Sequence, residues 1–242
     1  MKKSKYKLIL FDLDDTLIDN RENIKFAFKQ IVEKIGKIYS EEYFEKWLDF
    51  DKQYWNDFYA GKFEVPEKFK TPSSVYVVFA RSLRFQLFFK DISLDKAIEI
   101  NKVYILSLNE KVIAIDGAFE TLEYLSKNYK IVIATNGPSD AVKGKLSKIG
   151  CLDFILSYFS SDMTKGTISK PERAYFEELL DYINFHEKDA IVFVGNSLRK
   201  DVVGAMNFGI DAVWLNLDGR EGLKNVEPTF TVRKLTELKN IL

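Results

Sequence analysis

The chain reads LILFDLDDTL from Leu8 to Leu17, an apolar run that is followed by a cluster of aspartates. The apolar run predicts a buried β-strand, and the polar residues after it predict a loop. Because side chains alternate along a strand, Asp12 and Asp14 can share one side where the chain is still extended. Neighbouring carboxylates at the end of a buried element are costly unless a metal ion or a substrate requires them. N-capping of a following helix is the simpler alternative for both residues.

The composition indicates a soluble globular protein. The chain has 242 residues, of which 46% are hydrophobic and 30% charged, enough for one large domain or for a core with a smaller second domain. Lys+Arg and Asp+Glu each number 36, so the net charge is zero, and we expect neither a nucleic-acid polymer nor a membrane as partner. Cys151 is the single cysteine, which excludes an intramolecular disulfide, and we expect it to be buried in a cytoplasmic protein.

Residues 18–111 have the apolar spacing of helices. This spacing recurs in two groups: Ile24, Phe28, Ile31 and Ile35, then Trp47, Phe50, Tyr54, Trp55 and Phe58. Thr71-Pro72-Ser73 and Ser93 have the character of helix starts, so the segment predicts a bundle of about four helices. Aromatic rings can stack on nucleobases, but the interior of the bundle is the preferred interpretation for most of these rings.

Residues 112–242 alternate short apolar runs with helical patterns. The apolar runs are 131–134, 190–194 and 212–215, and the helical patterns are 118–125, 141–149, 172–183 and 201–208. This alternation predicts a parallel, doubly wound sheet with helices on both faces. In such sheets the functional residues follow the carboxyl ends of the strands, near the point where the strand order reverses.

Polar residues follow each predicted strand. They are Asp12, Asp14 and Thr16 after the first run, Thr135, Asn136 and Gly137 after the second, and Gly195, Asn196, Ser197 and Asp201 after the third. Lys170 precedes Pro171 just before a predicted helix. If the strands are adjacent, these groups suit a phosphoryl group with a hard divalent cation. Taken singly they have simpler interpretations: a turn at 135–137, a surface lysine, and a helix start at Asp201. The single histidine, His186, is expected in a surface connection.

Together the four motifs resemble the haloacid dehalogenase (HAD) superfamily, and the resemblance covers essentially the whole chain. They are Asp-Leu-Asp-Asp-Thr-Leu at 12–17, Thr-Asn-Gly at 135–137, Lys-Pro at 170–171, and Gly-Asn-Ser at 195–197 with Asp201. The resemblance implies an α/β fold, with a Rossmann-like core of residues 1–17 and 112–242. A helical cap domain of residues 18–111 would be inserted into this core. The pattern is similar to the subfamily I branch that includes pyrimidine 5′-nucleotidases.

This resemblance implies a Mg²⁺-dependent phosphomonoester hydrolase that acts on a small phosphorylated metabolite. A nucleoside 5′-monophosphate is the suggested substrate, and a monomer or homodimer is expected. Asp12 would be the nucleophile, Asp14 the general acid and then base, and Lys170 the cation that neutralises charge on both reactants. The implied phosphate ligands are Thr16, Thr135, Asn136, Gly137 and Lys170. The implied metal ligands are Asp12, Asp14 through its backbone carbonyl, Asn196 and Asp201.

One residue departs from the family pattern. Members usually have Asp where this chain has Asn196, and an amide offers an oxygen to Mg²⁺ without a negative charge. A metabolite-binding protein without activity is therefore one alternative. A phosphomutase would use Asp12 and Asp14 in the same way. A haloacid dehalogenase shares the fold but would not need Asp14, because no leaving alcohol requires a proton.

Overall fold

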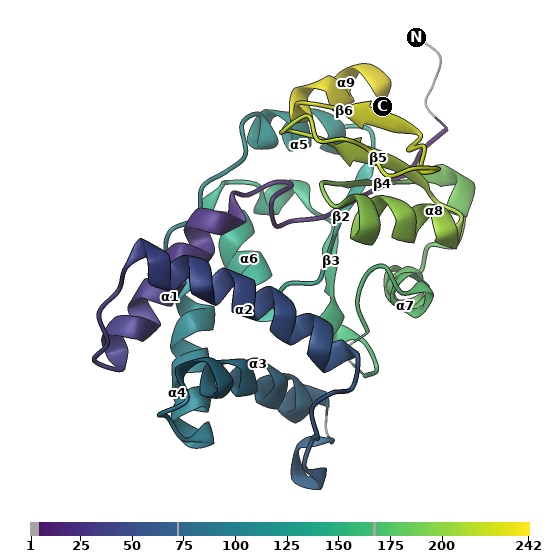
Figure 1. Cartoon of the computed structure of the whole chain (residues 1–242). Helices are drawn as coiled ribbons and strands as arrows, with labels where there is room; N and C mark the ends of the chain where they lie inside the picture. The colour runs from purple at the N-terminus through teal and green to yellow at the C-terminus, as the bar shows by residue number, and fades with distance from the viewer. Residues whose placement is uncertain (1–4, 72, 167) are drawn as a thin grey trace. The chain divides into compact units, whose positions relative to one another are not determined.

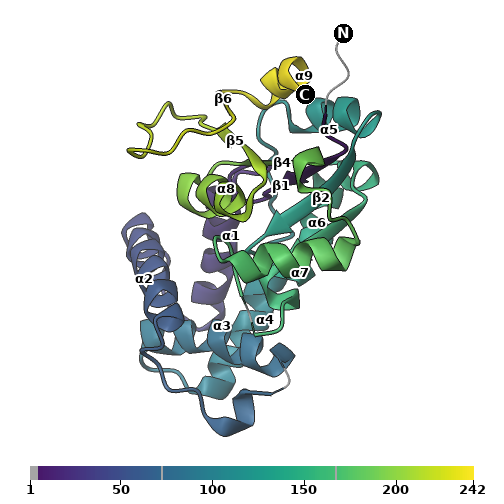
Figure 2. The ribbon, with the colours of Figure 1, turned by 90° about the vertical axis from the view of Figure 1, so that its right-hand side faces the viewer.

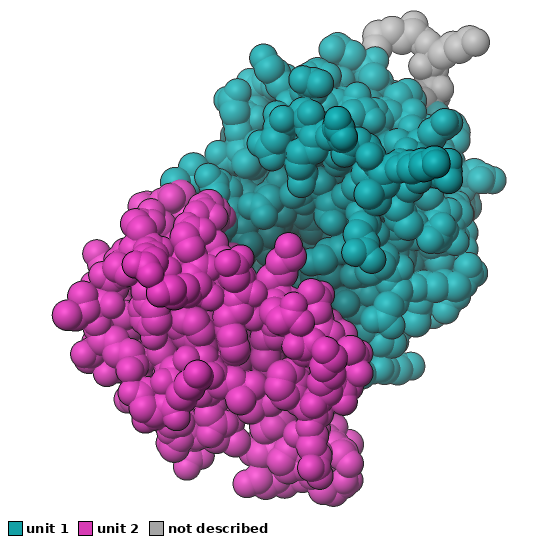
Figure 3. Space-filling view, in the orientation of Figure 1, with its two compact units in different colours: residues 1–20, 112–242 teal, residues 21–111 magenta. Residues whose placement is uncertain are grey.

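The computed structural model describes residues 5–71, 73–166 and 168–242. The chain divides into two compact units, which Figure 3 distinguishes by colour. Unit 1 comprises residues 1–20 and 112–242, and unit 2 comprises residues 21–111. The sequence prediction placed the two boundaries after residues 17 and 111. No helix in the described parts of the chain is both long and apolar enough to cross a bilayer.

Unit 1 is built on a parallel sheet, whose six strands in the described residues are shown in Figures 1 and 2. The strands are β1 (Leu8–Phe11), β2 (Lys130–Thr135), β3 (Ser157–Ser160), β4 (Ile191–Gly195), β5 (Asp211–Leu215) and β6 (Phe230–Val232). Their order is β3-β2-β1-β4-β5-β6, and each neighbouring pair is parallel. The predicted α/β fold with a parallel sheet is confirmed. The edge strands β3 and β6 were not predicted, because short, partly exposed strands carry no continuous apolar run.

Helices cover both faces of this sheet, because successive strand residues point to opposite sides. Ile9 and Phe11 pack in one layer with α5 (Ala118–Ser126), α6 (Ser139–Lys148) and α9 (Leu238–Ile241). Leu8 and Leu10 pack in the other layer with α7 (Arg173–Ile183) and α8 (Gly204–Phe208). All four strand residues are buried, as expected for a strand that is covered on both faces.

The predicted helix over 201–208 has two parts. It begins as a π-helix, η5 (Leu198–Val203), and continues as α8. Ser197 caps η5, where its hydroxyl accepts a hydrogen bond from the backbone N–H of Lys200 at 3.2 Å. The remaining short helices are η1 (Glu67–Phe69), η2 (Leu152–Phe154), η3 (Ser161–Met163), η4 (Lys188–Ala190) and η6 (Leu235–Glu237).

Unit 2 is helical, as predicted for this segment. Its main helices in the described residues are α1 (Asn20–Lys34), α2 (Glu41–Tyr59), α3 (Ser73–Phe89) and α4 (Leu94–Ser107). The predicted cap at Ser93 is confirmed by a 3.2 Å hydrogen bond from the N–H of Lys96. Pro72, part of another predicted helix start, lies outside the described residues. Trp47 is fully buried and stacks on Phe85 with ring centroids 4.9 Å apart, so the aromatic pattern largely forms the interior of this unit.

Candidate active site

The strand order places the candidate site at the carboxyl ends of β1 and β4. From β1 the sheet grows through β2 on one side and through β4 on the other, so the strand order reverses beside β1. Open α/β sheets bind ligands at this reversal point. Asp12 is the first residue after β1, and its N–H donates to the carbonyl of Val194 in β4 at 2.9 Å. The backbone ladder therefore holds Asp12 against the end of the neighbouring strand.

The carboxylate of Asp12 is buried, and both of its oxygens have partners. Oδ1 lies 2.8 Å from the ammonium Nζ of Lys170, and Oδ2 accepts a hydrogen bond from Oγ1 of Thr16 at 2.9 Å. Lys170 also donates to Oδ1 of Asp201 and to the carbonyl of Ala134, each at 2.7 Å. All three ammonium protons of Lys170 thus have acceptors, and Asp12 and Asp201 are bridged by one buried cation.

Burial sets the electrostatics of this cluster. It raises the pKa of Asp12 to about 7, against the opposing attraction of Lys170, while the negative charges of Asp201 and Asp14 push in the same direction as burial. Burial also works to lower the pKa of Lys170, but the charges of Asp12 and Asp201 outweigh it and hold that pKa above its ordinary value. The two carboxyl groups therefore favour the protonated, cationic form of Lys170.

Asp14 belongs to a second ion pair, in which the lysine is buried and the aspartate is partly exposed. Its Oδ1 lies 2.7 Å from Nζ of Lys145, a residue of α6 that is 1% exposed. The other oxygen, Oδ2, faces Gly137, and a Cβ added at Gly137 would lie 2.8 Å from this oxygen. Lys145 is not among the site residues predicted from the sequence. The sequence feature that could have revealed it is the position of this lysine on the core-facing side of a helix, in line with the buried residues Val142 and Leu146.

The Thr-Asn-Gly turn after β2 makes hydrogen bonds within itself and to the segment that carries Lys170. The hydroxyl of Thr135 accepts the N–H of Gly137 at 2.9 Å. The carboxamide of Asn136 makes two hydrogen bonds with the backbone of Lys170: Nδ2 donates to its carbonyl at 3.0 Å, and Oδ1 accepts its N–H at 2.9 Å. The side chain of Asn136 therefore fixes the segment that carries Lys170.

The loop after β4 completes the group. Oδ2 of Asp201 accepts the N–H of Ser197 at 2.9 Å, and an added Cβ at Gly195 would lie 2.4 Å from this oxygen. Asn196 places its Oδ1 3.5 Å from the hydroxyl of Thr16, and its N–H donates to that hydroxyl at 3.2 Å. Hydrogen bonds thus join six of the predicted residues into one network: Asp12, Thr16, Asn136, Lys170, Asn196 and Asp201. The side chain of Asp14 pairs with Lys145 instead, and Thr135 bonds to Gly137.

Two further residues support Asn196, and sequence reasoning missed both. Nε1 of Trp214 and Nη2 of Arg220 each donate to the carbonyl oxygen of Asn196 at 3.1 Å. Trp214 lies in β5, which neighbours β4, and Arg220 follows in the loop after β5. Nothing in the sequence indicates that Trp214, an apolar strand residue, and Arg220, a loop residue, contact the same carbonyl group.

The oxygen donors at this point fit Mg²⁺. The hydroxyl of Thr16 bridges Oδ2 of Asp12 and Oδ1 of Asn196, which brings a carboxylate and an amide oxygen close together. Mg²⁺ commonly binds through one or two carboxylates, waters and substrate phosphate, without a full protein cage. Residues 5–71, 73–166 and 168–242 contain no group of three or more His, Cys, Asp or Glu placed to hold a metal ion.

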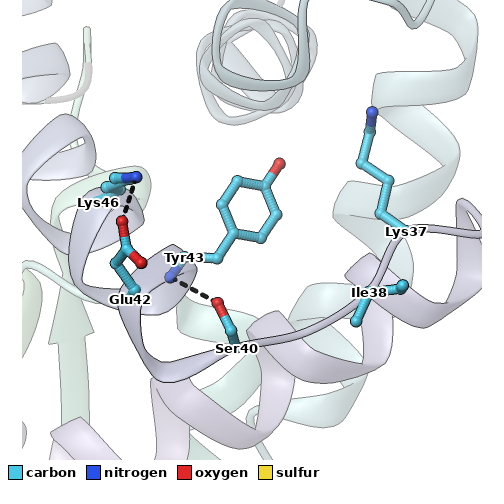
Figure 4. A pocket seen from close by; sticks show the side chains of 6 residues that line it. All are labelled: Lys37, Ile38, Ser40, Glu42, Tyr43 and Lys46. Carbon is cyan, nitrogen blue, oxygen red and sulfur yellow. Dashed lines mark hydrogen bonds and ion pairs between the residues drawn. The ribbon is translucent and has the colours of Figure 1, made fainter.

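A separate hollow of about 410 Å³ lies on the surface of unit 2 (Figure 4). Its lining residues are Lys37, Ile38, Ser40, Glu42, Tyr43 and Lys46. Lys46 pairs with Glu42 at 2.6 Å, and Lys37 pairs with Asp91 at 2.7 Å. This hollow belongs to unit 2 alone, whereas the predicted site residues all belong to unit 1.

A parallel α/β sheet with an aspartate motif directly after β1 places the chain in the Rossmann-like fold class. The family model of the haloacid dehalogenase-like hydrolases matches residues 6–209, and the chain belongs to this family. It is therefore a hydrolase, as the resemblance implied.

Similar proteins span nearly the same length as this chain. The HAD-hydrolase YfnB of Bacillus subtilis (strain 168) is 27% identical over 98% of this chain and 96% of its own. Its magnesium-bound crystal structure matches with a TM-score of 0.80 over 99% of both chains. Pyrimidine 5′-nucleotidase PynA of Streptococcus pneumoniae is 27% identical, over 98% of this chain and 97% of its own. Pyrimidine 5′-nucleotidase YjjG of Escherichia coli (strain K12) is 24% identical over 98% of both chains.

Proposed function

We propose that the protein is a Mg²⁺-dependent phosphomonoester hydrolase that forms an aspartyl-phosphate on Asp12. The observation that carries this proposal is the buried ammonium of Lys170, which contacts Asp12 and Asp201 at once. A carboxylate that approaches an anionic phosphoryl group meets like-charge repulsion, and a fixed cation beside it reduces that repulsion. The nucleotidase names of PynA and YjjG support a phosphate monoester as the substrate.

In the first step an oxygen of Asp12 attacks phosphorus, and the bond from phosphorus to the alcohol oxygen breaks. Asp14 gives its proton to the leaving oxygen, so the alcohol departs neutral. In the second step water attacks the phosphorus of the aspartyl-phosphate, and Asp14 takes a proton from that water. The bond to Asp12 breaks, inorganic phosphate leaves, and both aspartates return to their starting states.

The remaining residues of the network would bind the phosphoryl group and the metal. We assign the phosphoryl oxygens to Thr16, Thr135, the backbone around Asn136 and Gly137, and Lys170. We assign Mg²⁺ to Asp12, the backbone carbonyl of Asp14, Asn196 and Asp201. When bound, the ion would neutralise phosphoryl charge beside the nucleophile. Since Asp201 already accepts hydrogen bonds on both oxygens, its contribution would depend on sharing one of them.

The test is hydrolysis of p-nitrophenyl phosphate with and without Mg²⁺, with Asp12→Asn as the control. We expect turnover that needs Mg²⁺ and stops on chelation, and a loss of at least about a thousandfold in Asp12→Asn. Circular dichroism would confirm that the variant is folded. Equal activity in the variant, or indifference to chelation, would overturn the mechanism.

The rival activities need their own assays. Halide release from a 2-haloacid in place of phosphate release would identify a dehalogenase, and phosphoryl transfer between two positions of a sugar phosphate would identify a mutase. The contact between Asp14 and the buried Lys145 favours the phosphomonoester hydrolase over the dehalogenase, because a dehalogenase has no leaving alcohol to protonate. Binding of phosphate esters without turnover, even at high Mg²⁺, would identify a metabolite-binding protein.

We further propose that the substrate is a small metabolite of the nucleoside 5′-monophosphate class and that unit 2 acts as the cap. The names of PynA and YjjG support the substrate class. The division of the chain into two compact units supports the cap. A panel of nucleotides and sugar phosphates tests the substrate. The proposal places this activity in the cytoplasm, in a monomer or homodimer, which light scattering would distinguish.

A further inference from the structure

Lys145 has an unusual position for a lysine. It lies on α6 in line with Val142 and Leu146, which pack into the core of unit 1, and its side chain is 2% exposed. Lys143 and Lys148 on the same helix are exposed. Nζ of Lys145 lies 2.7 Å from Oδ1 of Asp14, a residue 131 positions earlier in the chain.

Stability alone does not favour a lysine at this position. A buried ammonium loses its hydration, and a buried ion pair is often no more stabilising than apolar side chains of similar volume. A methionine or leucine at position 145 would continue the apolar face of α6 formed by Val142 and Leu146. What an apolar residue lacks is a strong hydrogen-bond donor for the carboxylate of Asp14.

The surroundings of Asp14 constrain both of its oxygens. Lys145 binds Oδ1, and the bare backbone of Gly137 faces Oδ2 closely enough that a Cβ there would lie 2.8 Å away. An ammonium group only donates hydrogen bonds, so Oδ1 stays an acceptor and Oδ2 is the oxygen left to exchange a proton. The side chain of Asp14 keeps 20% exposure, so it is not sealed from an incoming ester.

We propose that Lys145 is a positioning residue that holds Asp14 for proton transfer to the leaving alcohol. This inference rests on the proposed phosphatase function. As phosphorus bonds to Asp12 and its bond to the alcohol oxygen breaks, the proton on Oδ2 of Asp14 passes to that oxygen. Lys145 keeps its own protons and its contact with Oδ1 throughout, so it acts through Asp14 and never touches the substrate.

The leaving group provides the test, because kcat/KM reports the steps up to transfer of the phosphoryl group to Asp12. p-Nitrophenolate is a weak base and departs without a proton, whereas an alkoxide needs one. We expect Lys145→Met to lower kcat/KM for an alkyl ester such as glycerol 2-phosphate at least about tenfold more than for p-nitrophenyl phosphate. Lys148→Met is the matched control and should leave both values unchanged.

A double-mutant cycle makes the test specific. If Lys145 acts through Asp14, adding Lys145→Met to Asp14→Asn should produce no further loss for the alkyl ester. Equal losses for both esters in Lys145→Met, or full additivity with Asp14→Asn, would overturn the inference. If the methionine variant does not fold, Lys145→Gln receives the same comparison. A wild-type protein without phosphatase activity would instead refute the proposed function, so the two failures are distinguishable.

Discussion

The carboxylates of Asp14 and Asp201 each lie against a glycine. A Cβ at Gly137 would come within 2.8 Å of Asp14, and a Cβ at Gly195 within 2.4 Å of Asp201. Neither glycine has a positive φ, so close approach and not backbone conformation requires these residues. At the residue scale the geometry of the site therefore depends on glycines, which have no Cβ, as much as on charged residues.

Gly137→Ala should clearly lower kcat/KM while it changes the melting temperature little. The new methyl group must displace the carboxylate of Asp14, and a shift of this kind should lower kcat/KM for an alkyl phosphate at least about tenfold. Steady-state kinetics and a thermal melt would measure the two effects. Gly222→Ala is the control, since the nearest atom its Cβ would meet among the described residues belongs to Trp214, at 4.0 Å. An unchanged kcat/KM in Gly137→Ala would contradict the placement of Asp14.

Asn196→Asp should strengthen Mg²⁺ binding. Oδ1 of Asn196 lies near the Thr16 hydroxyl that also contacts Asp12, and a carboxylate there would add a negative charge beside the oxygens that we propose bind the metal. We expect the Mg²⁺ concentration for half-maximal activity to fall at least about tenfold. The increase in melting temperature that Mg²⁺ produces should appear at correspondingly lower concentrations. If the Mg²⁺ concentration needed in both assays is unchanged, the proposal that Asn196 binds the metal is wrong.

At the scale of elements, the segment before β1 is tied to the start of β5. Lys5 contacts Asp211 at 2.5 Å, and the hydroxyl of Tyr6 donates to the same carboxylate at 2.8 Å. Burial acts to raise the pKa of Asp211, but the contacts with Lys5 and Tyr6 outweigh it and hold that pKa below its ordinary 3.8. Because Asp12 directly follows β1, this contact helps to hold the strand on which the position of Asp12 depends.

Asp211→Asn should therefore destabilise the protein in a pH-dependent way. A carboxyl pKa that is lower in the folded state stabilises the fold above the unfolded pKa, and this contribution is lost as the pH falls through the folded value. We expect a cost of about 0.5–1 kcal/mol at pH 7, since the pair is partly screened by solvent. Urea unfolding at several pH values would show the difference fade below the ordinary 3.8.

The exposed Asp189 offers a control for this series. Asp189→Asn should change the free energy of unfolding by less than about 0.5 kcal/mol at every pH. A difference between wild type and Asp211→Asn that persists unchanged into strong acid would show that packing, and not the charge of Asp211, is responsible.

At the scale of the whole molecule, the two units have interiors of different character. Unit 1 has two apolar layers, one on each face of the sheet. In unit 2 the interior is aromatic: Trp47 stacks on Phe85 and on Phe28, with centroids 4.9 and 5.4 Å apart. The buried Nε1 of Trp47 has no hydrogen-bond partner among the described residues.

Trp47→Ala should destabilise the protein by about 3–5 kcal/mol, because it leaves a large cavity among stacked rings. Trp47→Phe should cost only about 1–2 kcal/mol, since it keeps one ring and removes an N–H that is buried without a partner. Urea unfolding of both variants measures this difference. Ile38→Ala, at a position that is 90% exposed, should change stability by less than about 0.5 kcal/mol. Equal costs for the two Trp47 variants would contradict this role of the ring.

Much of the fold could be predicted because central parallel strands are buried on both faces. The continuous apolar runs at 131–134, 190–194 and 212–215 report that burial directly, and the sheet contains a strand at each. β3 and β6 lie at the sheet edges and are short and partly exposed, so no continuous run reveals them. The π-helix η5 was not predicted either, because the residue pattern of a helix does not distinguish a π turn from an α turn.

By itself, the sequence determined the α/β class and which polar residues follow the strands, since both depend on local patterns of burial. Only the tertiary structure decided which charge meets which. Lys170 reaches Asp12 across 158 residues and Lys145 reaches Asp14 across 131, whereas Asn136 turns its carboxamide to the backbone of Lys170. The physical reason is that these pairings depend on how helices pack against the sheet, and packing joins residues whose spacing in the chain carries no periodic signal.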